Sequence, residues 1–337
     1  MTTIKKIAEE LGLSPATISL ALNGSPLISE KTRKKVQDKA EELDYIPNNF
    51  GRGLQSKSSR LIGYMCNTPV HSFNAEIMEV FGLQAAQNKY GMVLGVAGDN
   101  FENFDKLFQL FLEKNVDAIV LALDTIFDGT HFSYFMEKIT KRKLPVLACA
   151  SEIVNADLPF VGINECQGAY ISAEYLLKIG HRHLLCPSKT ISPRRRNGYI
   201  AACRKYEVPE PFWADKPQEI VSHVLRHKEI TGVLCSSDLC AIQALALLKD
   251  NGVKVPDDVS VIGFDDIWFA ARPEYSLTTV IQHRLPLGEL AFSTILKMIN
   301  GEEIIHDQFI EPELILRSTT GRPEVVWSND KGNILCF

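Results

Sequence analysis

The sequence predicts a small all-α N-terminal domain followed by a larger α/β core of two lobes, each a doubly wound parallel sheet. The first 47 residues contain three short amphipathic runs separated by helix-capping residues. Beyond Arg60, short apolar runs alternate with helical stretches, which is typical of a parallel sheet with helices on both faces. Because about 270 residues of this pattern exceed what one open sheet usually needs, we expect two lobes.

The N-terminal runs have clear start and stop signals. The first helix carries apolar residues at helical spacing: Ile4, Ile7, Ala8 and Leu11. Gly12 suits the left-handed turn that ends it, and Ser14 then caps a second helix with Pro15 at its first position. Ser29 caps a third helix, whose outward face is expected to carry basic side chains: Lys31, Arg33, Lys34, Lys35 and Lys39. Three short helices would therefore share one small core.

Two helices joined by a glycine-containing turn are typical of the helix-turn-helix motif, whose second helix enters the major groove of DNA. Its exposed face would consist of Pro15, Ala16, Ser19 and Leu20, with Ser14 at its start. Ala16 and Leu20 are expected to read thymine methyls or groove shape. Hydroxyl, amide and ammonium groups are expected to contact phosphates: Thr3, Lys5, Thr17, Ser19, Asn23, Ser29 and Thr32. A plain three-helix subdomain with a charged surface is the alternative.

Charge supports a DNA-binding end. Residues 1–60 hold ten Lys and Arg against seven Asp and Glu, a net charge of +3, whereas the remainder holds 26 against 34, a net charge of −8. Phosphate neutralisation requires basic charge where DNA binds, so DNA is expected at the N-terminal end.

The sequence contains no motif typical of a secreted, membrane, metal-binding or enzymatic protein. No charged start followed by an apolar run opens the chain, and no stretch approaches the ~18 apolar residues of a membrane helix, so a cytoplasmic protein without a membrane partner is expected. The eight cysteines are scattered without C-x-x-C pairs, so neither a metal site nor a disulfide is expected. Dinucleotide, Walker, nucleophile-elbow and H-E-x-x-H motifs do not occur, so we expect neither an enzyme nor a cofactor.

The core pattern can be assigned segment by segment. Strands are expected at 61–66, 92–98, 117–123, 145–150, 160–164, 183–187, 232–236 and 259–264. Helices are expected at 74–89, 167–179, 239–251 and 286–299, among others, and FIEPELILRST (309–319) is expected to be a final strand.

The chain resembles a known family almost end to end. TTIKKIAEELGLSPATISLALNG and ISEKTRKKVQDKAEELDYIPN resemble the headpiece of the lactose repressor/galactose repressor (LacI/GalR) family of bacterial transcription regulators. GHRHLL, VPDDVSVIGFDD and SLTTVIQH are similar to the family's core, a periplasmic sugar-binding-protein fold that serves as a ligand sensor.

The resemblance implies a division of the chain. A helix-turn-helix domain would span 1–47, a hinge 48–59, a two-lobed effector-binding and dimerisation core 60–325, and a tail 326–337. Lobe one would comprise 61–160 and 285–312, and lobe two 161–284 and 313–325. The tail has no leucine heptads, so a coiled-coil tetramer is not expected.

The expected hinge contains NNFGRGLQ (48–55). In the family this stretch folds into a helix on DNA, and Leu54 falls where a leucine wedges into the minor groove, beside Arg52 as a further DNA contact. Gly51 and Gly53 stand where the family usually has alanine or serine, and each costs about 1 kcal/mol of helix propensity. An unbound hinge is therefore expected to be unfolded, and a plain linker is the alternative.

The resemblance also implies a set of effector contacts: Phe73 and Asn74 from lobe one, and Arg195, Ser237, Asp265 and Gln282 from lobe two or the crossover. A carboxylate that accepts hydroxyls, an arginine fork and an aromatic edge suit a polyol. Ser237 and Ala150 replace the family's frequent asparagine and acidic residue, which weakens the inference to an unmodified hexose. The run Arg194 to Arg196 suits a sugar phosphate instead, unless only Arg195 points inward.

The function expected from these observations is that of an effector-responsive, homodimeric repressor of carbohydrate-use genes. It would bind double-stranded DNA at a pseudo-palindromic operator. The alternatives are an activator or co-repressor-dependent regulator, and a cytoplasmic protein that binds a sugar or sugar phosphate without any DNA role. A sugar-transport protein of the same core fold would need a signal peptide and would lack residues 1–60.

Overall fold

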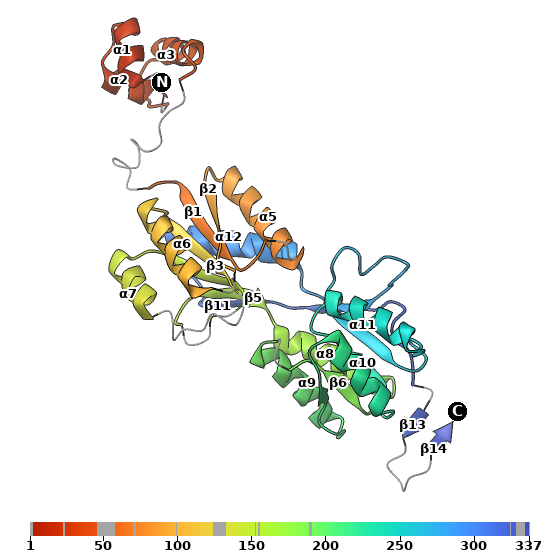
Figure 1. Ribbon diagram of the computed structural model, residues 1–337. Helices are drawn as coiled ribbons and strands as arrows, with labels where there is room; N and C mark the ends of the chain where they lie inside the picture. The colour runs from red at the N-terminus through yellow and green to blue at the C-terminus, as the bar shows by residue number, and fades with distance from the viewer. Residues whose placement is uncertain are drawn as a thin grey trace. The chain divides into compact units, whose positions relative to one another are not determined.

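The computed structural model describes residues 3–22, 24–45, 58–69, 72–98, 100–123, 133–151, 153, 156–188, 191–323, 325–327 and 334–336. The chain divides into two compact units, Met1–Ser59 and Arg60–Phe337 (Figure 1).

The first unit is a three-helix domain. Its helices are α1 (Ile4–Leu11), α2 (Pro15–Leu22) and α3 (Glu30–Glu42). Each begins at a hydroxyl side chain: the oxygens of Thr3, Ser14 and Ser29 accept hydrogen bonds from the main-chain N–H groups of Lys6, Thr17 and Thr32. Gly12 ends α1 in the left-handed conformation, with φ at 63°. The helices enclose one core: Ile7, Ala8, Ile18, Ala21, Val36 and Ala40.

The second unit contains two parallel-sheet lobes, and lobe one is built on the sheet β11-β5-β4-β3-β1-β2. Its strands are β1 (Leu61–Cys66), β2 (Gly91–Val96), β3 (Ala118–Ala122), β4 (Val146–Ala150), β5 (Phe160–Ile163) and β11 (Asp307–Ile310). Helices α5 (Ser72–Gln87) and α12 (Arg284–Asn300) cover one face, and α6 (Phe101–Glu113) and α7 (Ser133–Arg142) cover the other. Each face buries its own apolar cluster, one containing Phe81 and Phe292 and the other Phe104 and Phe108.

Lobe two repeats the layered design on the sheet β12-β10-β9-β8-β6-β7. Its strands are β6 (Leu184–Cys186), β7 (Phe212–Trp213), β8 (Gly232–Leu234), β9 (Ser260–Asp265), β10 (Thr278–Ile281) and β12 (Glu313–Ile315). Helices α8 (Glu165–Lys178) and α9 (Pro193–Lys205) pack on one face, and α10 (Pro217–Arg226) and α11 (Asp238–Asp250) on the other. Strands β13 (Val325–Trp327) and β14 (Ile334–Cys336) form a separate antiparallel pair.

The fold class predicted from the sequence is therefore confirmed, with one difference in detail. The run 309–319, expected to form a single strand, is divided at Pro312 into β11 of lobe one and β12 of lobe two. Proline lacks the N–H that a continuous ladder needs, and the chain changes sheets at this point. It also crosses between the lobes after β5 and after β10.

The described residues contain neither a membrane-spanning helix nor a cluster suited to a metal ion. None of the helices there combines the length and apolar character needed to cross a bilayer. The same residues contain no group of three or more His, Cys, Asp or Glu arranged to hold a metal ion.

Candidate functional site

Helix α2 separates a buried face from an exposed one. Ile18 and Ala21 point into the headpiece core, whereas Pro15, Ala16 and Leu20 are exposed. Ser19 is half-buried between these faces. An apolar, accessible strip thus runs along a helix whose opposite side is fixed by packing, which is the geometry a recognition helix needs.

Hydroxyl pairs mark the starts of α2 and α3. The side-chain oxygens of Ser14 and Thr17 lie 2.9 Å apart, and those of Ser29 and Thr32 lie 2.8 Å apart. Since one hydroxyl of each pair donates to the other, the second hydroxyl hydrogen can reach an outside acceptor. These positions are also helix N-termini, where main-chain N–H groups favour phosphate.

The basic face of α3 differs from the expected one. Arg33 is half-buried, and its Nη2 donates to the carbonyl oxygens of Ser25 and Ile28 at 3.1 and 3.4 Å. Lys39 is also half-buried, with its Nζ 2.6 Å from Glu42 and 3.5 Å from Glu10. Both were expected to point outward, and both instead satisfy groups within the domain.

The remaining expected contact residues are either exposed, half-buried or outside the described residues. Thr3 and Lys5 are exposed on the headpiece. Asn23, Arg52 and Leu54 lie outside the described residues, and so does the side chain of Phe73. Asn74 is half-buried in the first turn of α5.

In lobe two, a polar cluster forms at the carboxyl ends of neighbouring strands. Asp265 ends β9 and Gln282 follows β10; the Nε2 of Gln282 donates to Oδ1 of Asp265, and both side chains are buried. Ser237 follows β8, where its hydroxyl oxygen accepts a hydrogen bond from the N–H of Cys240 at 3.2 Å and caps α11. The carboxyl edge of a parallel sheet is the usual place for ligands in such folds.

Arg195 reaches this cluster from α9 and is buried there. Its guanidinium lies 3.7 Å from the centre of the Phe264 ring, and its Nη1 donates to the carbonyl oxygen of Ser236 at 2.8 Å. Its Nε and Nη2 donate to Oε1 of Glu165 at 3.2 and 2.5 Å. Glu165 was not anticipated from the sequence. It is the acidic residue in the first turn of α8, and nothing in that position indicates a partner 30 residues later.

The neighbouring arginines take different positions. Arg194 and Arg196 are exposed; their guanidinium carbons lie 5.2 Å from the Phe309 ring centre and 4.7 Å from the Trp213 ring centre. Only Arg195 is buried, so the three side chains do not form one cationic group.

Burial governs the charge of two carboxyl groups here. Desolvation raises the pKa of Asp265 to about 7, although Arg195, Gln282 and Arg284 favour its ionised form. Desolvation likewise raises the pKa of Asp238 to about 7. Asp238 accepts hydrogen bonds from the Thr279 hydroxyl at 2.5 Å and the Ile267 N–H at 2.9 Å, which fixes the loop after β9.

Arg284, also not anticipated, links the cluster to lobe one. From the start of α12, its Nε donates to Oε2 of Glu76 on α5 at 2.7 Å. Its Nη1 and Nη2 donate to the carbonyl oxygens of Asp265 and Asp266, the latter at 2.9 Å. One side chain therefore joins a lobe-one helix to the end of β9.

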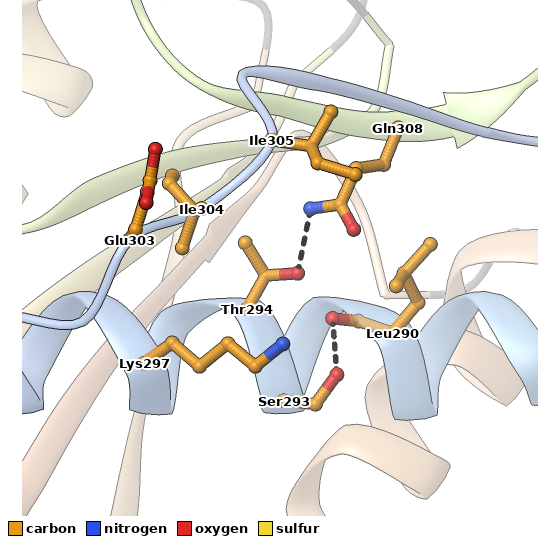
Figure 2. A pocket seen from close by; sticks show the side chains of 8 residues that line it. All are labelled: Leu290, Ser293, Thr294, Lys297, Glu303, Ile304, Ile305 and Gln308. Carbon is orange, nitrogen blue, oxygen red and sulfur yellow. Dashed lines mark hydrogen bonds between the residues drawn. The ribbon is translucent and has the colours of Figure 1, made fainter.

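A separate pocket of about 310 Å³ lies on lobe one, between α12 and the segment that leads into β11 (Figure 2). It is lined by Leu290, Ser293, Thr294, Lys297, Glu303, Ile304, Ile305 and Gln308. A hydrogen bond of 3.0 Å from Gln308 Nε2 to Thr294 Oγ1 closes one side. None of the expected effector residues lines this pocket.

The N-terminal domain and the α/β core resemble two different families of known proteins. Residues 3–48 match the family model for bacterial regulatory proteins of the lacI family, and residues 173–320 match a periplasmic binding protein-like domain. The HTH-type transcriptional repressor PurR of Vibrio parahaemolyticus is 28% identical over 335 residues, covering 95% of this chain and 98% of the relative. The ribose operon repressor of Haemophilus influenzae is 27% identical over 333 residues, with coverage of 95% and 98%.

Among solved structures, the fold is similar to the lac repressor dimer bound to operator and the anti-inducer ONPF. The TM-score is 0.85 at 21% identity, covering 95% of this chain and 99% of that one. A DNA-binding headpiece attached to a ligand-sensing core defines a class of transcription regulator. The chain belongs to the LacI family, and as a member it is a DNA-binding transcription regulator and not an enzyme.

Proposed function

We propose that this regulator is a homodimeric repressor of carbohydrate-use genes that binds a pseudo-palindromic operator in the cytoplasm and responds to a small sugar or sugar derivative. The observation that carries the proposal is the face of α2, where Pro15, Ala16 and Leu20 are accessible while Ile18 and Ala21 anchor the helix. Membership of the LacI family and the names of its repressor relatives support the same function.

The DNA contacts are proposed in two groups. Ala16 and Leu20 would face thymine methyls or the groove surface, beside Ser14 and Pro15 at the start of α2. The groups that set the register on phosphates would be Thr3, Lys5, Thr17, Ser19, Asn23, Ser29 and Thr32. Arg52 and Leu54 would act through the hinge, Leu54 by opening a base step in the minor groove.

Selection from a random duplex library tests the DNA function. The purified chain should enrich a palindromic sequence at near-physiological salt, and the core starting at Arg60 should not, because it lacks the headpiece. Failure of a folded dimer to enrich any sequence would contradict the proposal.

We also propose that the effector binds at the cluster formed by Arg195, Asp265 and Gln282, with Ser237 beside it and Phe73 and Asn74 from lobe one. Their position at the carboxyl edge of the lobe-two sheet supports this assignment. Effector binding would favour one arrangement of the lobes, and the DNA affinity would change with it.

Asp265→Ala tests the effector site. The variant should lose the effector response, at least 100-fold in effector concentration, while operator binding without effector is retained, because the headpiece is unchanged. Asp257→Ala, which removes an exposed carboxylate of the same lobe, is the control and should respond normally. A normal response of Asp265→Ala would place the effector elsewhere.

The dimer is proposed to form through one apolar surface of lobe one. Strand β2 lies at an edge of its sheet, and Leu94 and Val96 on it are exposed by 41% and 45%. Leu83 on α5, the helix that packs beside β2, is exposed by 59%. An open strand edge beside large apolar side chains is a surface that a second copy can cover.

A further inference from the structure

Arg195 is the cation best placed for an anionic ligand, but an internal partner already holds it. Of its five N–H groups, the one on Nε and one of the two on Nη2 donate to Glu165, and one of the two on Nη1 donates to Ser236. Two N–H groups remain without a partner in the described part of the chain. The positive charge is therefore neutralised, while donating capacity is kept.

Glu165 is fixed in this position from both sides. Its Oε1 receives Arg195, and its Oε2 accepts a hydrogen bond from the hydroxyl of Ser192. Ser192 itself caps α9, the helix that carries Arg195, and Glu165 stands in the first turn of α8. Two residues at the start of α9 therefore hold the carboxylate of Glu165 beside the guanidinium.

The surrounding charges do not restore a positive site. The second cation, Arg284, is engaged by Glu76 and by two main-chain carbonyls. Asp265 adds a third carboxyl group, so two guanidinium groups face three carboxyl groups. The cluster has no excess positive charge, whether Asp265 is ionised or protonated.

From this arrangement, we propose that the effector is an uncharged polyol and that Glu165 is the specificity residue that excludes phosphorylated and other anionic ligands. The inference rests on the effector site proposed above. A phosphate that displaced Glu165 from Arg195 would leave the buried carboxylate without its partner. A phosphate that lay beside Glu165 would be repelled by its negative charge. Hydroxyl groups both donate and accept, so they suit the accepting oxygens of Asp265 and the two remaining N–H groups of Arg195.

Matched ligand pairs test the proposal on the complete wild-type chain. Ribose, glucose and galactose are compared with ribose 5-phosphate, glucose 6-phosphate and galactose 6-phosphate by thermal shift and calorimetric titration. At least one neutral sugar should bind, and its phosphorylated form should bind at least tenfold more weakly.

The role of Glu165 is tested with Glu165→Gln, using inorganic phosphate as the probe. Removal of the carboxylate should free the charge of Arg195 and tighten phosphate binding at least tenfold. Glu311→Gln is the control: Glu311 accepts from Asn164, next to Glu165 in the sequence, at 3.0 and 3.2 Å and does not contact Arg195. Its phosphate affinity should equal that of the wild type.

The outcomes separate this inference from the proposed function. Wild-type binding of a sugar phosphate as tightly as its parent sugar would overturn the proposal, and so would an unchanged phosphate affinity in a folded Glu165→Gln variant. The comparison of sugars with sugar phosphates uses the wild type alone, so it tests the preference for a neutral ligand even if Glu165→Gln does not fold. If no sugar binds while specific DNA binding is intact, the polyol assignment is wrong and the DNA-binding function stands.

Discussion

At the scale of single residues, His181 couples folding of the core to pH. Its Nδ1 lies 2.8 Å from the Thr231 hydroxyl, and its Nε2 lies 3.0 Å from both the Ser260 hydroxyl and the Gly321 carbonyl oxygen. Burial lowers its pKa to about 4, from 6.5 in an exposed histidine. Below about pH 6.5 the unfolded chain therefore binds a proton that the folded chain excludes, and stability is lost as the pH falls toward 4.

We predict that, between pH 7 and pH 4.5, the wild type loses about 2–3 kcal/mol more unfolding free energy than a His181→Asn variant. Urea unfolding of both proteins at the two pH values measures this difference. The raised pKa values of Asp238 and Asp265 act in the opposite direction, because these groups favour the folded state as the pH falls from about 7. The effect of His181 is therefore the difference in unfolding free energy between the wild type and His181→Asn at each pH, and not the change in the wild type alone.

His306→Asn serves as the control, because His306 has a side chain exposed by 54%. It should follow the wild type at both pH values. Equal pH dependence of the His181→Asn variant and the wild type would show that the buried imidazole does not titrate as described.

The site residues show which contacts a sequence can predict. Asp265 ends β9 and Gln282 directly follows the adjacent parallel strand β10, so their proximity follows from the strand pattern once the sheet order is known. Glu165 and Arg284 meet their partners across 30 and 208 residues, and no spacing rule connects such pairs. The charge balance of the site therefore needed the three-dimensional structure.

At the scale of elements, α8 and α9 pack closely where Gly198 faces α8. A Cβ atom on Gly198 would lie 2.2 Å from the Cys166 carbonyl oxygen and 2.8 Å from the Ala169 Cβ. The backbones can approach only because no side chain is present. Since α8 carries Glu165 and α9 carries Arg195, this close packing also sets the distance between the two charged groups.

Gly198→Ala should lower the unfolding free energy by about 1–3 kcal/mol, because the helices must separate. It should also weaken effector binding, because Glu165 and Arg195 move apart with their helices. Thermal unfolding and effector titration measure the two effects. Gly82→Ala in α5 is the control: its Cβ would lie 3.6 Å from Met92, an ordinary contact, and it gains helix propensity. A variant at 198 as stable as the one at 82 would disprove the close-packing argument.

Strands and helices were largely predictable from their apolar patterns, but those patterns alone do not say which sheet a strand joins; only the family resemblance suggested a division into lobes. The expected strand 145–150 is β4 at Val146–Ala150, and the expected helix 286–299 lies within α12. By contrast, 309–319 looks like one strand because its apolar residues continue across Pro312. Which sheet each half joins depends on its partners, Phe160–Ile163 for one half and Thr279–Ile281 for the other.

At the scale of the whole molecule, the proposed repressor function depends on presenting two headpieces at once. One headpiece contacts only one half-site, so its affinity and specificity are limited, whereas a dimer binds the second half-site as an intramolecular step. If the dimer forms as proposed, the lobe-one surface of Leu83, Leu94 and Val96 would contribute to DNA affinity without touching DNA.

Leu94→Glu should convert the dimer to a monomer at micromolar concentration, because a carboxylate would be buried without a partner in the interface. Operator affinity should fall at least 100-fold with the loss of the second headpiece. Sedimentation and operator titration measure the two effects. Leu110→Glu on α6 is the matched control, since Leu110 is exposed by 38% against 41% for Leu94 but lies on the other face of the sheet. Leu110→Glu should remain dimeric. If Leu94→Glu also remains dimeric, the proposed interface on β2 is wrong.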